Sequence, residues 1–186
     1  ANRSKPNNNF RITTMRLKNI AFLVLTLVFS QATAQDRSKL NFLVGNFVTE
    51  VTMPPGPSMP KGATGKGSSA IVWALDSTVL LIDEHSVNSL FGRYEGHGVL
   101  CFDAQTRQFE LFMFNNFGDH PSYKGDFVGD TLMLETKVPM PAHPFDQRLL
   151  WYREGNVVKL KVMNNPGNGF VLAVDQTATP VSAKQK

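Results

Sequence analysis

The stretch that decides the fold is "GRYEGHGVLCFD", which runs from Gly92 to Asp103. Successive side chains of a β-strand point to opposite sides of the sheet. One face of this stretch therefore holds glycines and aromatic residues, among them Tyr94, Gly96 and Gly98, and the other face is mostly polar. Glycines inside a strand mark bulges, sharp barrel corners or a close approach of two backbones. The stretch predicts one strand of a strongly curved sheet.

Strand-like segments continue along most of the chain and are joined mainly by short turns. A proline- and glycine-rich loop is expected over Met53 to Gly67, and a short helical turn in "DRSKLNFLVG", residues 36–45, capped by Asp36 or Ser38. The expected strands are 46–52, 69–76, 78–87, 92–103, 109–116, 122–128, 131–138, 147–154, 157–163 and 170–178.

The spacing of these segments predicts an all-β fold, namely an antiparallel up-and-down β-barrel of about ten strands. Ten strands in an open sheet would leave two unpaired edges, and closing the sheet into a barrel removes both. The runner-up architecture is a β-sandwich of two sheets.

The N-terminal region reads as a targeting segment. Residues 15–34, "MRLKNIAFLVLTLVFSQATA", have a basic start, a short apolar middle and an Ala-x-Ala end, which together predict a signal peptide. The apolar run is too short to span a membrane as a helix. Residues 1–14 are taken as an upstream extension outside the fold. We therefore expect one β-barrel domain, residues 35–186, that is exported to the periplasm or secreted from the cell.

The net positive charge of the chain comes from residues 1–34. The whole sequence has 19 basic and 15 acidic residues, and five of the basic ones precede residue 35, so the expected domain carries 14 − 15 = −1. No cluster of lysine and arginine remains, and this argues against a nucleic-acid partner. Cys101 is the single cysteine, so the domain forms no internal disulfide and has no cysteine-based zinc motif. The histidines and acids match no metal-ligand spacing, and no metal site is expected.

Two sets of motifs resemble known β-barrel families. Leu40, Leu43, Gly45 and Phe47 form an L-x-x-L-x-G-x-F pattern that resembles the G-x-W opening of lipocalin-like (calycin) barrels, with Phe47 in place of tryptophan. The middle of the chain resembles a bacterial calycin-like family known as domain of unknown function 1579. The matching stretches are "YEGHG" at 94–98, "FDAQT" at 102–106, the aromatic run 109–114 and "GDFVGDTLML" at 125–134. The resemblance covers roughly residues 40–178 and implies a calycin-like barrel without a defined activity.

The expected function is the binding of a small apolar or amphipathic ligand inside the barrel. Which face of strand 92–103 points inward is left open by the pattern. In the segment 109–116, Phe112 and Phe114 share one face and Met113 lies on the other, so only one of these sets can line a cavity. The candidate ligand-binding residues are Trp73, Arg93, Tyr94, Glu95, His97, Phe112, Phe114 and Trp151.

No catalytic motif stands out in the sequence. A G-x-S-x-G nucleophile elbow is absent, and no pair of carboxylates is set apart from ordinary solvated acids. We assign no catalytic residue and no cofactor. Two alternatives remain: a haem-dependent enzyme similar to the nitrobindins, with a histidine as axial ligand, and an interaction protein of the cell envelope that uses the loop 53–67.

Overall fold

The computed structural model describes residues 37–56, 59–139 and 144–181 of the chain. The signal-peptide segment, the upstream extension and the Asp36 cap lie outside these residues. The predicted all-β fold is confirmed. The elements are η1 (Lys39–Leu43), β1 (Gly45–Met53), β2 (Ala63–Ala74), β3 (Val79–Asn88), β4 (Gly92–Asp103), β5 (Gln108–Asn115), β6 (Ser122–Val128), β7 (Thr131–Val138), β8 (Phe145–Glu154), β9 (Val157–Asn165) and β10 (Val171–Pro180).

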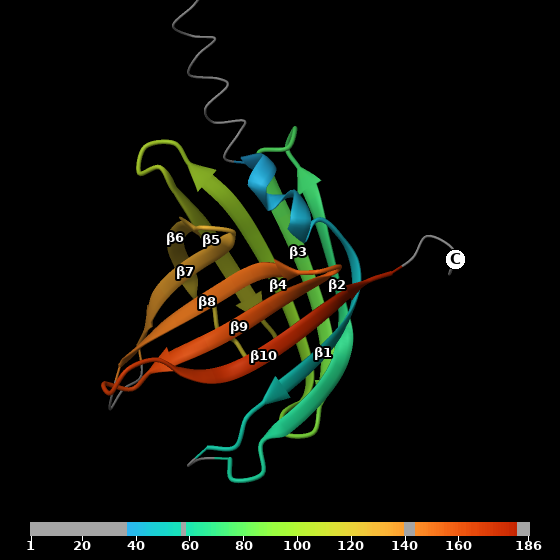
Figure 1. Cartoon of the computed structure of the whole chain (residues 1–186), viewed down its shortest axis with the longest axis vertical. Helices are drawn as coiled ribbons and strands as arrows, with labels where there is room; N and C mark the ends of the chain where they lie inside the picture. Colours follow the sequence, from blue (N-terminus) through green and yellow to red (C-terminus); the bar gives the residue numbers. More distant parts are fainter. Residues whose placement is uncertain (1–36, 57–58, 140–143, 182–186) are drawn as a thin grey trace, which may run out of the picture. The chain divides into compact units, whose positions relative to one another are not determined.

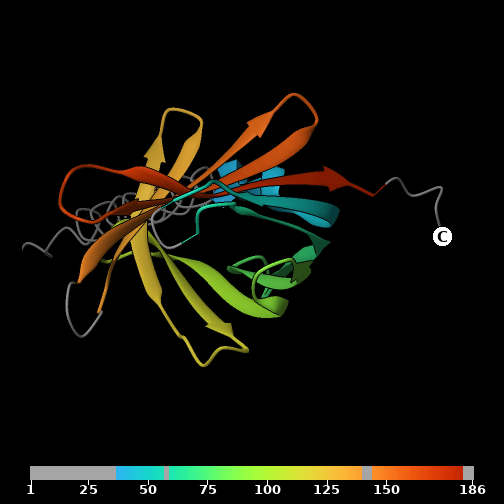
Figure 2. The same ribbon diagram turned by 90° about the horizontal axis from the view of Figure 1, so that it is seen from below.

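The ten strands form a closed antiparallel up-and-down barrel (Figure 1). Each strand pairs with its neighbours in sequence, and β1 pairs with β10 to complete the ring, with Phe47 opposite Pro180. Figure 2 shows this ring from below. Within the described residues, we find no helix with the length and apolar character needed to cross a membrane.

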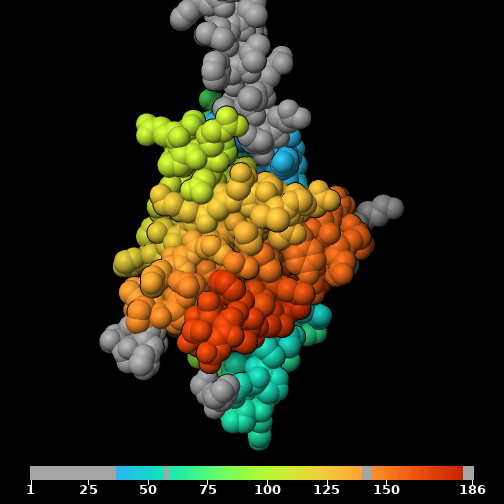
Figure 3. Space-filling view, turned by 60° about the vertical axis from the view of Figure 1, so that its left-hand side comes forward, coloured from blue at the N-terminus to red at the C-terminus, as the bar shows by residue number. Residues whose placement is uncertain are grey.

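The two ends of the barrel differ. The hairpins β1–β2, β3–β4 and β5–β6 meet at one end, which is the lower end in Figure 1. The turns β2–β3, β4–β5, β6–β7 and β8–β9 lie at the other end, which we call the turn end. In the space-filling view of Figure 3, strands β7 to β10 form a continuous wall, and the β1–β2 hairpin extends below it.

The hydrophobic core fills the half of the barrel nearest the turn end. Among the strands, the fully buried residues come from the starts of β3, β5 and β7 and the end of β4, where they alternate with less buried ones. Each buried leucine contributes about 1.5–3 kcal/mol of hydrophobic stabilisation. An edge-to-face aromatic chain, Phe102–Phe109–Phe127, continues this core, with ring centroids 5.2 and 5.6 Å apart. The fully buried leucines of the strands are Leu80, Leu100, Leu111, Leu132 and Leu134.

Strand β2 begins earlier than its sequence suggests. We expected a loop up to Gly67, but Ala63–Ala74 form one strand. A Cβ added at Gly67 would overlap the carbonyl oxygen of His85 on β3, and one at Gly65 would lie 2.8 Å from the Cβ of Asn88. The glycines therefore belong to a strand that packs tightly against its neighbour, and the connecting loop is correspondingly shorter.

The β3–β4 hairpin has a three-residue loop that begins after Asn88. Asn88 pairs with Gly92, so the loop consists of residues 89–91. The Asn88 side-chain oxygen accepts hydrogen bonds from the backbone N–H groups of Leu90 and Phe91, at 3.0 and 2.6 Å. Gly92, with φ of +71°, then returns the chain to β4. This loop carries Phe91 to the hairpin end of the barrel.

Candidate functional site

A cavity of about 280 Å³ occupies the half of the barrel nearest the hairpins. Its walls come from nearly every strand, because the inward residues of a barrel alternate with outward ones along each strand. The volume approaches the lower end of the range for small-molecule sites. Most of the wall is apolar and includes Val51, Leu111, Met113, Leu149, Trp151, Leu160, Val162 and Val174.

The glycine face of β4 points into the barrel. Gly96 and Gly98 are buried, while His97 between them is exposed. A Cβ added at Gly96 would lie 2.6 Å from the Tyr94 hydroxyl oxygen, and one at Gly98 would lie 2.6 Å from the Met113 sulfur. The two glycines therefore make room for two side chains that line the cavity.

Glu84 on β3 places a carboxyl group on the inner face of the barrel. The Gln176 side chain donates a hydrogen bond to it over 2.9 Å. Burial raises the pKa of Glu84, and the hydrogen bond from Gln176 opposes that rise. None of the ion pairs among the described residues involves Glu84. The described lining contains no lysine, arginine or histidine, so Glu84 has no cationic partner there.

Two tyrosines bring hydroxyl groups to the cavity. Tyr123 donates a hydrogen bond to Gln147 over 2.5 Å, and Gln147 donates one to Asn164 over 2.9 Å. Burial raises the pKa of Tyr123 to about 12. Burial, with the nearby charge of Glu84, also raises the pKa of Tyr94. Both hydroxyls therefore remain protonated and able to donate near neutral pH.

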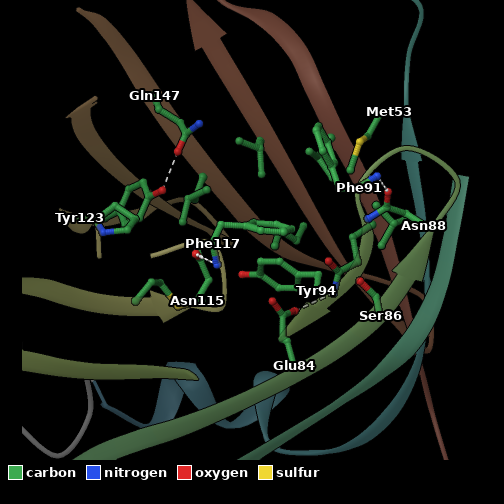
Figure 4. Close-up of a pocket in the computed structure, with 18 of the residues that line it drawn as sticks. Met53, Glu84, Ser86, Asn88, Phe91, Tyr94, Asn115, Phe117, Tyr123 and Gln147 are labelled. Carbon is green, nitrogen blue, oxygen red and sulfur yellow. Dashed lines mark hydrogen bonds between the residues drawn. The ribbon is translucent and has the colours of Figure 1, made fainter. Parts of the chain in front are cut away.

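Aromatic rings surround the mouth of the cavity. Phe117 lies 5.9 Å from Tyr94 and 6.1 Å from Phe91, measured between ring centroids. Phe91 and Phe117 are about half exposed, at 57% and 51%. Figure 4 shows the Tyr94 ring between Phe117 and the Glu84 carboxyl. A ligand that enters the barrel would pass these rings before it reaches the carboxyl.

A second, smaller space adjoins the cavity on its turn-end side. It measures about 20 Å³ and shares Glu84, Trp151, Leu160 and Gln176 with the larger cavity. A space of this size holds about one water-sized group. Ser69, which is opposite Glu84 in the β2–β3 ladder, also lines it, and its buried hydroxyl oxygen has no hydrogen-bond partner among the described residues. We call this volume the head space.

Of the eight residues proposed from the sequence, Tyr94 and Trp151 line the cavity. Phe112 and Phe114 are 40% and 55% exposed and lie on the outer face of β5. The opposite face of β5, with Phe109, Leu111 and Met113, points inward. Trp73 lies near the end of β2, away from the cavity, where its indole N–H donates to Asn41 over 3.0 Å.

Arg93, Glu95 and His97 lie on the outer face of β4, since the glycine face points inward. Glu95 pairs with Arg93 and lies 3.7 Å from His85 on β3. His97 contacts Asp83 at 2.5 Å. In the part of the chain that the structure describes, no group of three or more histidines, cysteines or acids is arranged to hold a metal ion.

Three polar lining residues, Glu84, Tyr123 and Gln176, are not among the candidates from the sequence, whereas Met113 lies on the face of its strand that the pattern left as the alternative to Phe112 and Phe114. The sequence carries no signal for Glu84, because Val79 and Leu81 on one face of β3 are as apolar as Leu80 and Ile82 on the other, and each face ends in an acid. Gln176 has no signal either, since β10 is half-buried on both faces. A search against protein-family models and a search of curated proteins both find no match to this chain.

Proposed function

We propose that this protein is an exported, calycin-like barrel that binds a small apolar or amphipathic molecule in its cavity. The observation that carries the proposal is an apolar cavity with a few convergent polar groups, namely Glu84, Tyr94 and Tyr123. This composition is typical of small-molecule sites. The open hairpin end, with its exposed aromatic rings, gives the ligand a path of entry.

No observation favours the haem-dependent alternative over simple binding. His85 and His97 lie on the outer faces of β3 and β4, and His120 is exposed in the β5–β6 loop. None of these three lines the cavity. His143 lies outside the described residues.

Native mass spectrometry tests the proposal on protein produced from the full coding sequence in a bacterial host. We expect a species heavier than the polypeptide that loses the extra mass on denaturation. Protein that carries no ligand should bind added hexanol in calorimetry. A bare polypeptide mass together with no heat of binding for hexanol, hexylamine or hexanoate would contradict the proposal.

A pair of matched variants locates the binding event. Val162→Phe places a ring in the cavity, whereas Val48→Phe adds the same ring on the exposed outer face of β1. We expect the first variant to lose the ligand or the hexanol signal by about tenfold or more and the second to retain it. Equal binding by both variants would place the ligand outside the barrel.

A further inference from the structure

The head space combines features that fit one chemical group. It is lined by Glu84 and Ser69. Ser69 is only 5% exposed, and its hydroxyl oxygen has no hydrogen-bond partner among the described residues. The carboxyl and hydroxyl oxygens can both accept hydrogen bonds. A buried hydroxyl without a partner is unfavourable, so a bound group that donates to Ser69 would be stabilised.

The charge of the site also indicates a ligand that donates hydrogen bonds and carries a positive charge. A buried carboxylate is costly unless a cation compensates it, and no described lysine, arginine or histidine lies at the cavity. The inner face of β3 already holds the Glu84 side chain half-buried before any ligand binds, and a cation beside it would stabilise the ionised carboxylate. Trp151 lines both spaces and presents an aromatic surface that also favours a cation.

The position of the head space indicates that the rest of the ligand is apolar. It lies deeper than the main cavity, whose adjoining walls are apolar, including Leu149 and Leu160. A group held at Glu84 would therefore leave its remaining atoms against hydrocarbon and aromatic side chains. The head must also be small, since the head space has room for about one water-sized group.

We propose that the cavity selects molecules with a primary ammonium head on an apolar body, the head lying beside Glu84 and Ser69. This inference rests on the proposed ligand-binding function and assigns the ligand class. The ammonium group donates to the Glu84 carboxylate and to the Ser69 hydroxyl, and the body lies in the main cavity.

Calorimetry with three probes of equal chain length tests this assignment: hexylamine, hexanol and hexanoate. We expect the unmodified protein to bind hexylamine at least about tenfold more tightly than hexanol, because a charge-assisted contact replaces a neutral one, and hexanoate the most weakly. Glu84→Gln should bring hexylamine down to the affinity of hexanol. Ser69→Ala should weaken hexylamine binding several-fold and hexanol binding by a smaller factor, because a hydrogen bond from a charged donor is stronger than one from a neutral donor.

Glu50→Gln is the matched control, because Glu50 is an exposed acid on the outer face of β1. This variant should keep the preference for the amine. Hexanol binding as tight as hexylamine binding in the unmodified protein would overturn the amine assignment and leave the ligand-binding proposal standing. The absence of binding by all three probes would overturn both. The comparison of probes on the unmodified protein decides the question even if Glu84→Gln does not fold.

Discussion

Successive side chains of β3 alternate between its two faces, so Glu84 lies on the same inner face as the buried residues Leu80 and Ile82. Its position is therefore a consequence of strand geometry, and the strand cannot expose Glu84 without exposing the two apolar residues. The carboxyl receives one hydrogen bond from Gln176 and no ion pair from the described residues. Such a site favours the neutral form of the acid while the cavity holds no cation.

This leads to a prediction on pH and stability. The pKa of Glu84 rises on folding from its ordinary value of 4.5, so the unfolded chain loses the proton at lower pH than the folded chain. Glu84 therefore lowers the free energy of unfolding progressively as pH rises above this value. Glu84→Gln removes this effect. Its unfolding free energy should lie within about 1 kcal/mol of the parent at about pH 4 and exceed it increasingly towards about pH 7.

Urea unfolding at several pH values measures this difference. All other titrating groups are common to the two proteins, so the pH dependence of the difference belongs to Glu84. A difference that stays constant with pH, or that shrinks as pH rises, would contradict the prediction.

At the scale of elements, the strands were predictable and their glycines were harder to interpret. Alternating apolar and polar residues located all ten strands, because burial of one face imposes that pattern locally. The beginning of β2 was missed, because Gly65 and Gly67 are equally typical of loops and of tight strand packing. The inward face of β5 was left open, since Phe112 and Phe114 are as apolar as Leu111 and Met113, and only the register with β4 and β6 separates them.

The packing of glycine against a neighbouring strand gives a second prediction. An alanine methyl at Gly67 would overlap the carbonyl oxygen of His85, and one at Gly125 would overlap that of Met133. Since backbone atoms cannot turn away as side chains do, we expect Gly67→Ala and Gly125→Ala each to lower the free energy of unfolding by about 1–3 kcal/mol. Denaturant titration measures this loss.

Gly56→Ala is the control for these variants, because nothing lies within 4 Å of a Cβ added at Gly56. Its stability should change by less than about 0.5 kcal/mol. If the three variants were equally stable, the close approach of β2 to β3 and of β6 to β7 would not be a constraint on these positions.

At the scale of the whole molecule, the sequence predicts a leader that is removed before the barrel acts. We expect the protein made in a bacterial host from Met15 to begin at Gln35 and to appear in the periplasm or the medium. Intact mass measurement of each cell fraction checks this. Ala34→Phe changes the small residue at the cleavage site and should leave the leader attached. A cytoplasmic product that starts at Met15 would contradict the export proposal.

The pairing of β1 with β10 has a consequence for the order of the strands along the chain. The Val181 N–H donates to the carbonyl oxygen of Asn46 over 2.8 Å, so the beginning of the first strand and the end of the last are immediate neighbours. A short linker could join them, and new termini could be opened in the surface turn 104–107, far from the cavity. Such a circular permutant would keep the same ring of strands and the same interior while starting its polypeptide at β5.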